Sequence, residues 1–191
     1  MNDSTEDDQT KTVLIVDDET GLADLYAAYL EDHYETRTAY NGDEALEMMD
    51  DEVDILLLDR RMPRQSGGEV MTNLRERGYD QPVAMLTAVD PGNDILDLAI
   101  DDYFVKPIDQ AELREAVSSL AARIQYDREF REYFAMVSKK ATMEANMSDQ
   151  ELASSDAYQT LKESTITARE ETDTALTEMM VTDAVAGFRD L

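Results

Sequence analysis

"VDILLLDRRMPRQSGG" (residues 53–68) contains an apolar run that ends abruptly on an acidic residue. Isoleucine and leucine fill residues 55–58 without a polar interruption, which is typical of a strand buried on both faces. The run stops at Asp59, and a Met-Pro turn and a pair of glycines follow it. This pattern predicts a buried strand that presents one carboxylate at its carboxyl end.

Similar runs alternate with amphipathic helical patterns along the first two thirds of the chain. The predicted strands cover residues 12–16, 34–40, 53–59, 82–88 and 102–107, and the predicted helices cover residues 21–32, 41–51, 67–78, 93–101 and 109–126. Apolar strands that alternate with helices indicate a parallel sheet covered on both faces. With right-handed crossovers, five such units predict an α/β doubly wound fold with the flavodoxin-like strand order 2-1-3-4-5.

The composition is strongly acidic. The 191 residues include 44 Asp and Glu against 17 Lys and Arg, so the net charge is −27. Such a surface repels itself in dilute buffer, but at roughly 1 M salt the Debye length falls to about 3 Å and the repulsion is screened. We therefore predict a halophilic protein from a salty cytoplasm, and the alternative is an acidic protein from an ordinary cell.

Several classes of function are not expected from this composition. The chain has no Cys, which excludes disulfides and thiolate metal sites. It has no basic stripe of the kind that binds nucleic acid, and no apolar segment of membrane-spanning length or basic apolar leader. We therefore expect a cytoplasmic protein that binds neither DNA nor membrane directly.

Polar residues stand at the carboxyl ends of the predicted strands. Asp17 and Asp18 follow the first strand, Asp59 ends the third, Thr87 ends the fourth and Lys106 follows the core of the fifth. In a doubly wound sheet these ends meet near the switch point between strands 1 and 3. Three adjacent carboxylates require a cation, and their oxygen ligands favour Mg²⁺. The set therefore predicts a site where a carboxylate forms an acyl phosphate.

Residues 11–125 resemble the CheY-like receiver domain of two-component response regulators. The resemblance rests on the acidic pair after strand 1, on "DRRMP" from Asp59 with Gly67 behind it, on "TA" at 87–88 and on Lys106-Pro107. It implies that Asp59 is the phosphoacceptor for a sensor histidine kinase in a phosphorelay. The chain would then be a signalling phosphoprotein that catalyses only its own phosphorylation and dephosphorylation.

The resemblance also implies the ligands of the metal ion. Asp18 and Asp59 would bind Mg²⁺ directly, together with the backbone carbonyl of Arg61, and Asp17 would contribute through water. The alternative for the acidic pair is that Asp17 and Asp18 only cap the following helix, because Asp is a favoured N-cap residue.

Three further roles follow from the resemblance. Thr87 and Lys106 would contact the phosphoryl oxygens, and Tyr103 would be the aromatic switch residue whose ring turns inward on activation. The alternatives are an ordinary strand-end threonine at Thr87 and an ordinary half-buried strand tyrosine at Tyr103.

Two other functional classes stay open for the same residues. One is a phosphohydrolase with Asp17 as nucleophile and Glu19 two residues on, which would leave Asp59 without a role and expects a further acidic pair after the lysine. The other is a pseudo-receiver that binds partners without being phosphorylated, which the complete set of site residues argues against.

The remaining residues divide into a short N-terminus and a helical tail. Residues 1–10 are acidic and predicted to be disordered, and residues 126–191 form a predicted all-α domain, with or without a break in the helix at its start. Ser148 and Glu151 form a capping-box pattern that starts a new helix. The apolar rows are Phe130, Phe134, Val137 and Ala141 before it, and Leu161, Thr165, Ala168, Thr172, Ala175 and Met179 after it.

These two helices are predicted to pack as an antiparallel hairpin or against a second chain. By position, charge and helical pattern the tail resembles the HalX-type C-terminal domain of haloarchaeal response regulators. We expect a weak or phosphorylation-dependent homodimer, formed through the face of segments 93–101, 102–107 and 109–126 or through the C-terminal helices. Its expected target is another protein.

Overall fold

The computed structural model describes residues 10–88 and 100–187, and the chain separates into two compact units, residues 1–121 and 122–191. The first unit holds a five-stranded parallel sheet with the order β2-β1-β3-β4-β5, as predicted. The strands are β1 (Thr12–Val16), β2 (Glu35–Ala39), β3 (Ile55–Asp59), β4 (Val83–Thr87) and β5 (Asp102–Val105).

Helices connect the strands of the first unit. They are α1 (Thr20–Leu30), α2 (Gly42–Met48), α3 (Gly67–Glu76) and the first part of α4 (Gln110–Asn146). The predicted helix over 93–101 falls almost wholly outside the described residues. Each observed element lies within a few residues of its predicted range, because the turn residues between the apolar runs end the strands and begin the helices.

The sheet explains which strands are continuously apolar. The central strands β3 and β4 are buried at every position, and β1 is buried at all but its first residue. The outer strands β2 and β5 are mostly half-buried, which is why their sequences alternate or mix polar residues. Each fully buried leucine of the centre contributes roughly 1.5–3 kcal/mol by leaving water. The buried centre thus holds the strand ends that carry Asp17, Asp59 and Thr87 in place.

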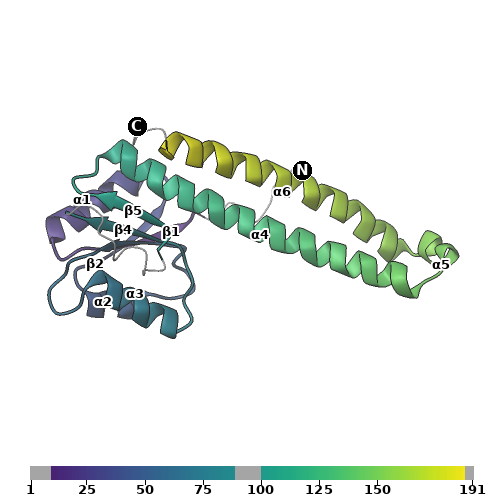
Figure 1. Cartoon of the computed structure of the whole chain (residues 1–191), viewed down its shortest axis with the longest axis horizontal. Coiled ribbons are helices and arrows are strands. Elements are labelled where there is room, and N and C mark those ends of the chain that lie inside the picture. Colours follow the sequence, from purple (N-terminus) through teal and green to yellow (C-terminus); the bar gives the residue numbers. More distant parts are fainter. Residues whose placement is uncertain (1–9, 89–99, 188–191) are drawn as a thin grey trace. The chain divides into compact units, whose positions relative to one another are not determined.

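The second unit is a helical hairpin. Helix α4 runs unbroken to Asn146, and α6 (Asp156–Gly187) returns beside it after the short α5 (Asp149–Ser154) (Figure 1). The predicted capping box is present, since Ser148 accepts from the Glu151 amide and Glu151 accepts from the Ser148 amide. It starts only α5, however, and the long helix begins separately after Ser155, whose hydroxyl accepts from the Tyr158 amide.

The two predicted rows of the hairpin have different outcomes. On α6 the predicted row is the packed one, with Ala168, Thr172 and Ala175 buried. On α4 the predicted row is wrong as a packing face, because Phe130 and Phe134 are exposed. Other half-buried residues of this part of α4 follow a neighbouring row, Tyr133, Met136, Lys140 and Met143, while Val137 is the half-buried member of the predicted row.

Among the described residues no helix is both long enough and apolar enough to cross a membrane.

Candidate phosphoryl and metal site

Three carboxylates meet at the carboxyl edge of the sheet. Asp17 follows β1 and Asp59 ends β3, and these strands are hydrogen-bonded neighbours with Val16 opposite Leu58. One carboxylate oxygen each of Asp17, Asp18 and Asp59 lies within 4.8 Å of the other two. Asp17 and Asp59 are buried, whereas Asp18 is exposed, so the cluster opens to solvent on one side.

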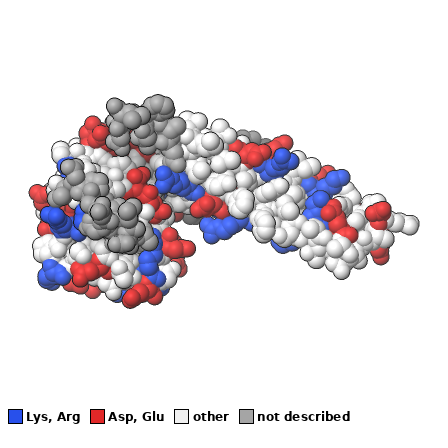
Figure 2. Space-filling model, in the orientation of Figure 1, with Lys and Arg blue, Asp and Glu red and all other residues white. Residues whose placement is uncertain are grey.

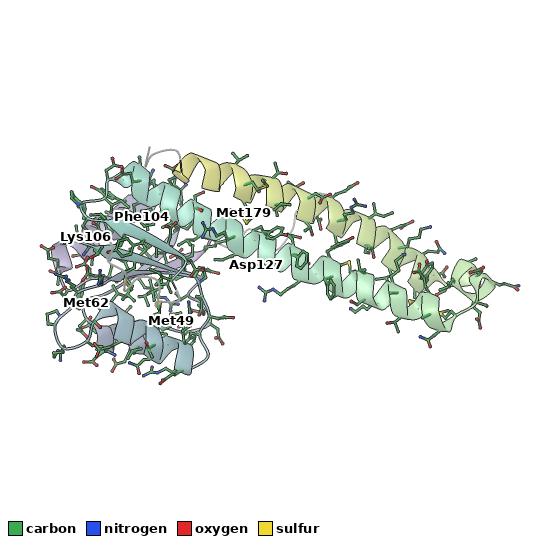
Figure 3. All side chains as sticks on the ribbon, viewed as in Figure 1. Met49, Met62, Phe104, Lys106, Asp127 and Met179 are labelled. Carbon is green, nitrogen blue, oxygen red and sulfur yellow. The ribbon has the colours of Figure 1, made fainter. Side chains whose placement is uncertain are left out.

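Lys106 reaches this cluster from the end of β5. Lys106 directly follows β5 and is labelled in Figure 3. Its ammonium lies 2.5 Å from Oδ2 of Asp17 and 2.5 Å from Oδ1 of Asp59. The backbone holds the lysine in place, since its amide donates to the Thr87 carbonyl at 2.6 Å. The structure thus brings together residues that are up to 89 positions apart in the chain.

The second oxygen of Asp59 has a backbone donor. The amide of Arg61 donates to Oδ2 at 2.7 Å. This contact depends on the turn after β3, and the sequence carries no specific signal for it. A carboxylate that accepts from an ammonium on one oxygen and from an amide on the other has its orientation set by both.

The surroundings shift the pKa values of both charged partners. Burial raises the pKa of Asp59 above its ordinary value, and the nearby Asp17 charge adds to this, although Lys106 and the Arg61 amide oppose it. Burial lowers the pKa of Lys106, but the hydrogen bonds to Asp17 and Asp59 outweigh burial, so its pKa is raised. Lys106 therefore stays an ammonium beside a partly desolvated carboxylate.

Gly67 allows the backbone behind Asp59 to pack closely. A Cβ atom at this position would lie 2.3 Å from the Asp59 carbonyl oxygen, a distance no side chain can occupy. The Gly67 amide donates to the Arg60 carbonyl at 3.0 Å. Ser66 and Glu69 form a capping box that starts α3 at this point, and the sequence pattern S-x-x-E indicates such a box. Glycine is needed here because two backbone segments approach closely.

The acidic pair does not cap α1. The N-cap residue of α1 is Glu19, which makes no side-chain capping bond. Asp17 instead accepts from the Glu19 amide through Oδ1 at 3.0 Å while its Oδ2 contacts Lys106. The alternative that Asp17 and Asp18 serve only as helix caps therefore does not describe the structure.

Thr87 and Tyr103 lie on the strands beside β3. Thr87 ends β4 and is 1% exposed, and Tyr103 is half-buried on β5 against the apolar core. The Arg60 guanidinium donates to the Tyr103 hydroxyl at 3.4 Å, a contact that pattern reasoning did not find. It links the residue after Asp59 to the predicted switch tyrosine.

The donor set suits a hard divalent cation. Carboxylate oxygens from three aspartates converge, one aspartate is solvent-exposed, and neither histidine nor cysteine takes part. Oxygen-only ligands with an open side are typical of Mg²⁺, which keeps several waters when it binds proteins.

The chain belongs to the response regulator receiver domain family, whose sequence profile matches residues 13–118. The profile of the HalX domain matches residues 122–188. The predicted family and fold are therefore confirmed, and the class is that of response regulators, which are signalling proteins.

Two relatives illustrate the match. A Haloferax volcanii protein named as a candidate transcriptional regulator is 44% identical over 136 residues, which are 71% of this chain and 23% of the relative. The response regulator SaeR of Staphylococcus epidermidis is 35% identical over 116 residues, 59% of this chain and 51% of SaeR. The chain thus spans a quarter to a half of these relatives. The Haloferax relative agrees with the halophilic composition.

Among solved structures, the response regulator TrrA from Thermotoga maritima in complex with Mg²⁺ and BeF is 37% identical, with a TM-score of 0.51. The superposition covers 58% of this chain and 99% of TrrA. The part of the chain that is alike is therefore the size of one receiver domain.

Proposed function

We propose that Asp59 accepts a phosphoryl group from a sensor histidine kinase and that Mg²⁺ takes part. The observation that carries this proposal is the setting of the Asp59 carboxylate, which is 5% exposed, contacts Lys106 at 2.5 Å and stands in a three-carboxylate cluster. Family membership supports a kinase as the donor. The proposed role is that of a phosphoacceptor and not of an enzyme acting on other substrates.

The proposed metal ligands are the Asp18 and Asp59 carboxylates and the Arg61 carbonyl, with Asp17 acting through water. When bound, Mg²⁺ would neutralise charge that develops on the phosphoryl oxygens. Asp17 and Asp59 already share the Lys106 ammonium, so a bound cation would add to the neutralisation that the lysine supplies.

The chain's own residues would perform the transfer mainly by position. An Asp59 oxygen forms the new bond to phosphorus as the bond to the kinase imidazole breaks, and the imidazole leaves as a neutral ring that keeps the proton already on its other nitrogen. Lys106 stays charged and moves from Asp59 toward the phosphoryl oxygens, and the Thr87 hydroxyl donates to one of them. Such groups stabilise a metaphosphate-like transition state without forming covalent bonds themselves.

The output is proposed to pass to the helical tail. We assign residues 11–125 to the receiver and residues 126–191 to a HalX-like output domain, with Thr87 and Tyr103 as the switch pair. The contact from Arg60 to Tyr103 supports this, because it ties the switch tyrosine to the residue beside Asp59. The proposed target is another protein in the cytoplasm, reached by a dimer whose formation responds to phosphorylation.

Incubation with Mg²⁺ and acetyl phosphate in molar KCl, followed by mass mapping of the modified aspartate, tests the acceptor. We expect label on Asp59, none in Asp59→Asn, and unchanged label in the control Asp80→Asn, whose side chain is exposed in a loop. Label on Asp17 would instead indicate the phosphohydrolase, and no label on any aspartate would indicate a pseudo-receiver.

A further inference from the structure

Helix α4 carries a row of exposed apolar side chains within the second unit. The rings of Tyr126, Phe130 and Phe134 follow one another with centroids 6.0 and 6.4 Å apart. Phe130 and Phe134 are 46% and 61% exposed, and Val137 and Ala141 continue the spacing. We call these five residues the apolar row. Two large exposed rings, continued by the half-buried Tyr126 and Val137 and the small Ala141, form a contiguous apolar patch, which marks an interaction surface more than scattered apolar residues do.

A groove between α4 and α6 extends this surface. It has a volume of about 690 Å³, and its apolar lining includes Tyr133, Val137 and Ala141 from α4 and Ile166 from α6. Ile166 is 55% exposed. Since Val137 and Ala141 belong to both features, the apolar row and the groove form one continuous face of the hairpin.

The charges of this groove balance one another. Three cations and three acids line it, namely Lys140, Lys162, Arg169, Glu144, Glu170 and Asp173. Two of the cations pair inside the chain, Lys140 with Glu144 at 2.7 Å and Arg169 with Asp173 at 3.9 Å. The whole chain, by contrast, has 17 cations against 44 acids. Figure 2 shows both signs of charge beside uncharged surface along the hairpin.

The hairpin has a second groove with the opposite character. It has a volume of about 310 Å³, and its charged lining consists of Glu129, Glu170, Glu171 and Glu178, without Lys or Arg. A copy of a strongly acidic chain would be repelled at this groove. The two grooves therefore differ in net charge, which is balanced in the first and negative in the second.

We propose that the apolar row and the charge-balanced groove form an isologous interface with a second copy of this chain. Molar salt screens charges farther apart than about 3 Å, so only charges in direct contact count, and two copies of a chain of charge −27 meet at least cost where those charges balance. In a two-fold arrangement each copy places its rings on the apolar lining of the other, and each cation of one copy can face an acid of the other. A partner of either net charge would find no matching excess in the groove.

The proposal does not depend on phosphoryl transfer. All residues of the interface lie between positions 126 and 173, in the second unit, and none belongs to the Asp59 site. The readout below is a molecular mass, so its failure leaves the acceptor assignment untouched. Loss of phosphorylation at Asp59 would leave the residues of the interface in place and would change only how far phosphorylation shifts the equilibrium between monomer and dimer.

Sedimentation of the full chain in molar KCl over a wide concentration range tests the interface. The expected result is a reversible dimer, and Phe134→Ser should raise its dissociation constant by roughly thirtyfold or more, the effect of losing one central aromatic contact. Leu25→Ser is the matched control, because Leu25 is 43% exposed but lies on α1, and it should leave the constant unchanged. Circular dichroism checks that helix content is kept.

Cross-linking provides a second readout, because the chain has no cysteine of its own. Val137→Cys and Ala141→Cys should link two copies rapidly through a short bifunctional maleimide, and Thr174→Cys in the acidic groove should link slowly. A protein that sediments as a monomer at every concentration would overturn the proposal, even if the apolar row binds some other protein. A dimer that is indifferent to Phe134→Ser, or equal linking rates at all three positions, would also overturn it.

Discussion

Lys106 lies against Asp17 and Asp59 with a side chain 11% exposed, whereas Lys140 lies against Glu144 with a side chain 31% exposed. The first contact gathers charge at one edge of a buried sheet, and the second is one of several pairs spread along a solvated hairpin. Coulomb attraction is strong only where water is excluded. The comparison therefore distinguishes a buried, tightly coupled ion cluster in the first unit from solvent-screened ion pairs along the hairpin.

The two regions also differ in what packs them. Leucine, isoleucine and valine fill the buried strands of the first unit, while Ala168, Thr172 and Ala175 form the buried row of α6. Small side chains bury little apolar area, so they stabilise a helix pair weakly. The receiver can consequently carry the cost of buried charge, and the hairpin leaves apolar surface over for association.

The largest effect should come from Lys106→Ala without Mg²⁺. Its removal leaves Asp17 and Asp59 buried without their cation, which costs about 3 kcal/mol or more. Lys140→Ala is the control in the hairpin and should change the unfolding free energy little, because its pair is exposed. Chemical denaturation measures both. Mg²⁺ should stabilise Lys106→Ala more than the wild type, since it takes over the neutralisation, and equal stabilisation would contradict the shared role.

A somewhat smaller loss is expected for Gly67→Ala. The added Cβ would meet the Asp59 carbonyl oxygen at 2.3 Å, so the end of β3 must move, at a cost of about 2 kcal/mol. Gly21→Ala is the matched control, because nothing lies within 4 Å of its Cβ position and alanine suits a helix better. The melting temperature and the rate of phosphorylation by acetyl phosphate should both fall for Gly67→Ala and not for Gly21→Ala. A normal phosphorylation rate in this variant would contradict the role of the close approach.

Asp59→Asn should stabilise the protein at neutral pH without Mg²⁺, by about 1 kcal/mol. The pKa of Asp59 is raised in the folded state by burial, so the folded protein binds its proton more tightly than the unfolded chain. By linkage this carboxyl contributes less stability as pH rises through its folded pKa. The advantage of Asp59→Asn should therefore vanish in acid, and a difference that grows toward acid pH would contradict the sign.

The smallest effect is expected in the hairpin, for Thr172→Val. Thr172 is 8% exposed, and its hydroxyl donates to the Ala168 carbonyl at 2.7 Å within the same helix. Valine keeps the shape and adds apolar contact, so a gain of roughly 0.5 kcal/mol is expected. Urea denaturation of the full-length protein measures the change in unfolding free energy. A clear decrease would show that the hydroxyl is needed in this row.

Strand order and strand ends could be predicted from the sequence because the apolar runs stop at polar residues. Short, almost wholly apolar runs such as "TVLIV" and "VDILLLD" are typical of parallel strands that are buried on both faces of a sheet. The capping box at Ser148 predicts a single helix start, whereas the structure has a second start after Ser155, whose hydroxyl accepts from the Tyr158 amide. The residues that meet at the strand ends follow from topology alone.

Other features could not be predicted, for physical reasons. On α4 two rows one residue apart are both apolar, and periodicity cannot tell whether the row of Phe130 or the row of Tyr133 faces α6. The contacts of Arg60 with Tyr103 and of the Arg61 amide with Asp59 depend on the turn after β3. Such contacts arise from tertiary geometry, for which single-residue patterns carry no signal.

The most direct test of the central claim is the melting temperature in molar KCl with Mg²⁺ and beryllofluoride, a phosphoryl mimic. A ligand that binds only the folded site raises the melting temperature. We predict a clear rise for the wild type, a smaller one for Lys106→Ala and none for Asp59→Asn, each compared with Mg²⁺ alone. An equal rise in Asp59→Asn would contradict the assignment of Asp59 as the phosphoryl acceptor.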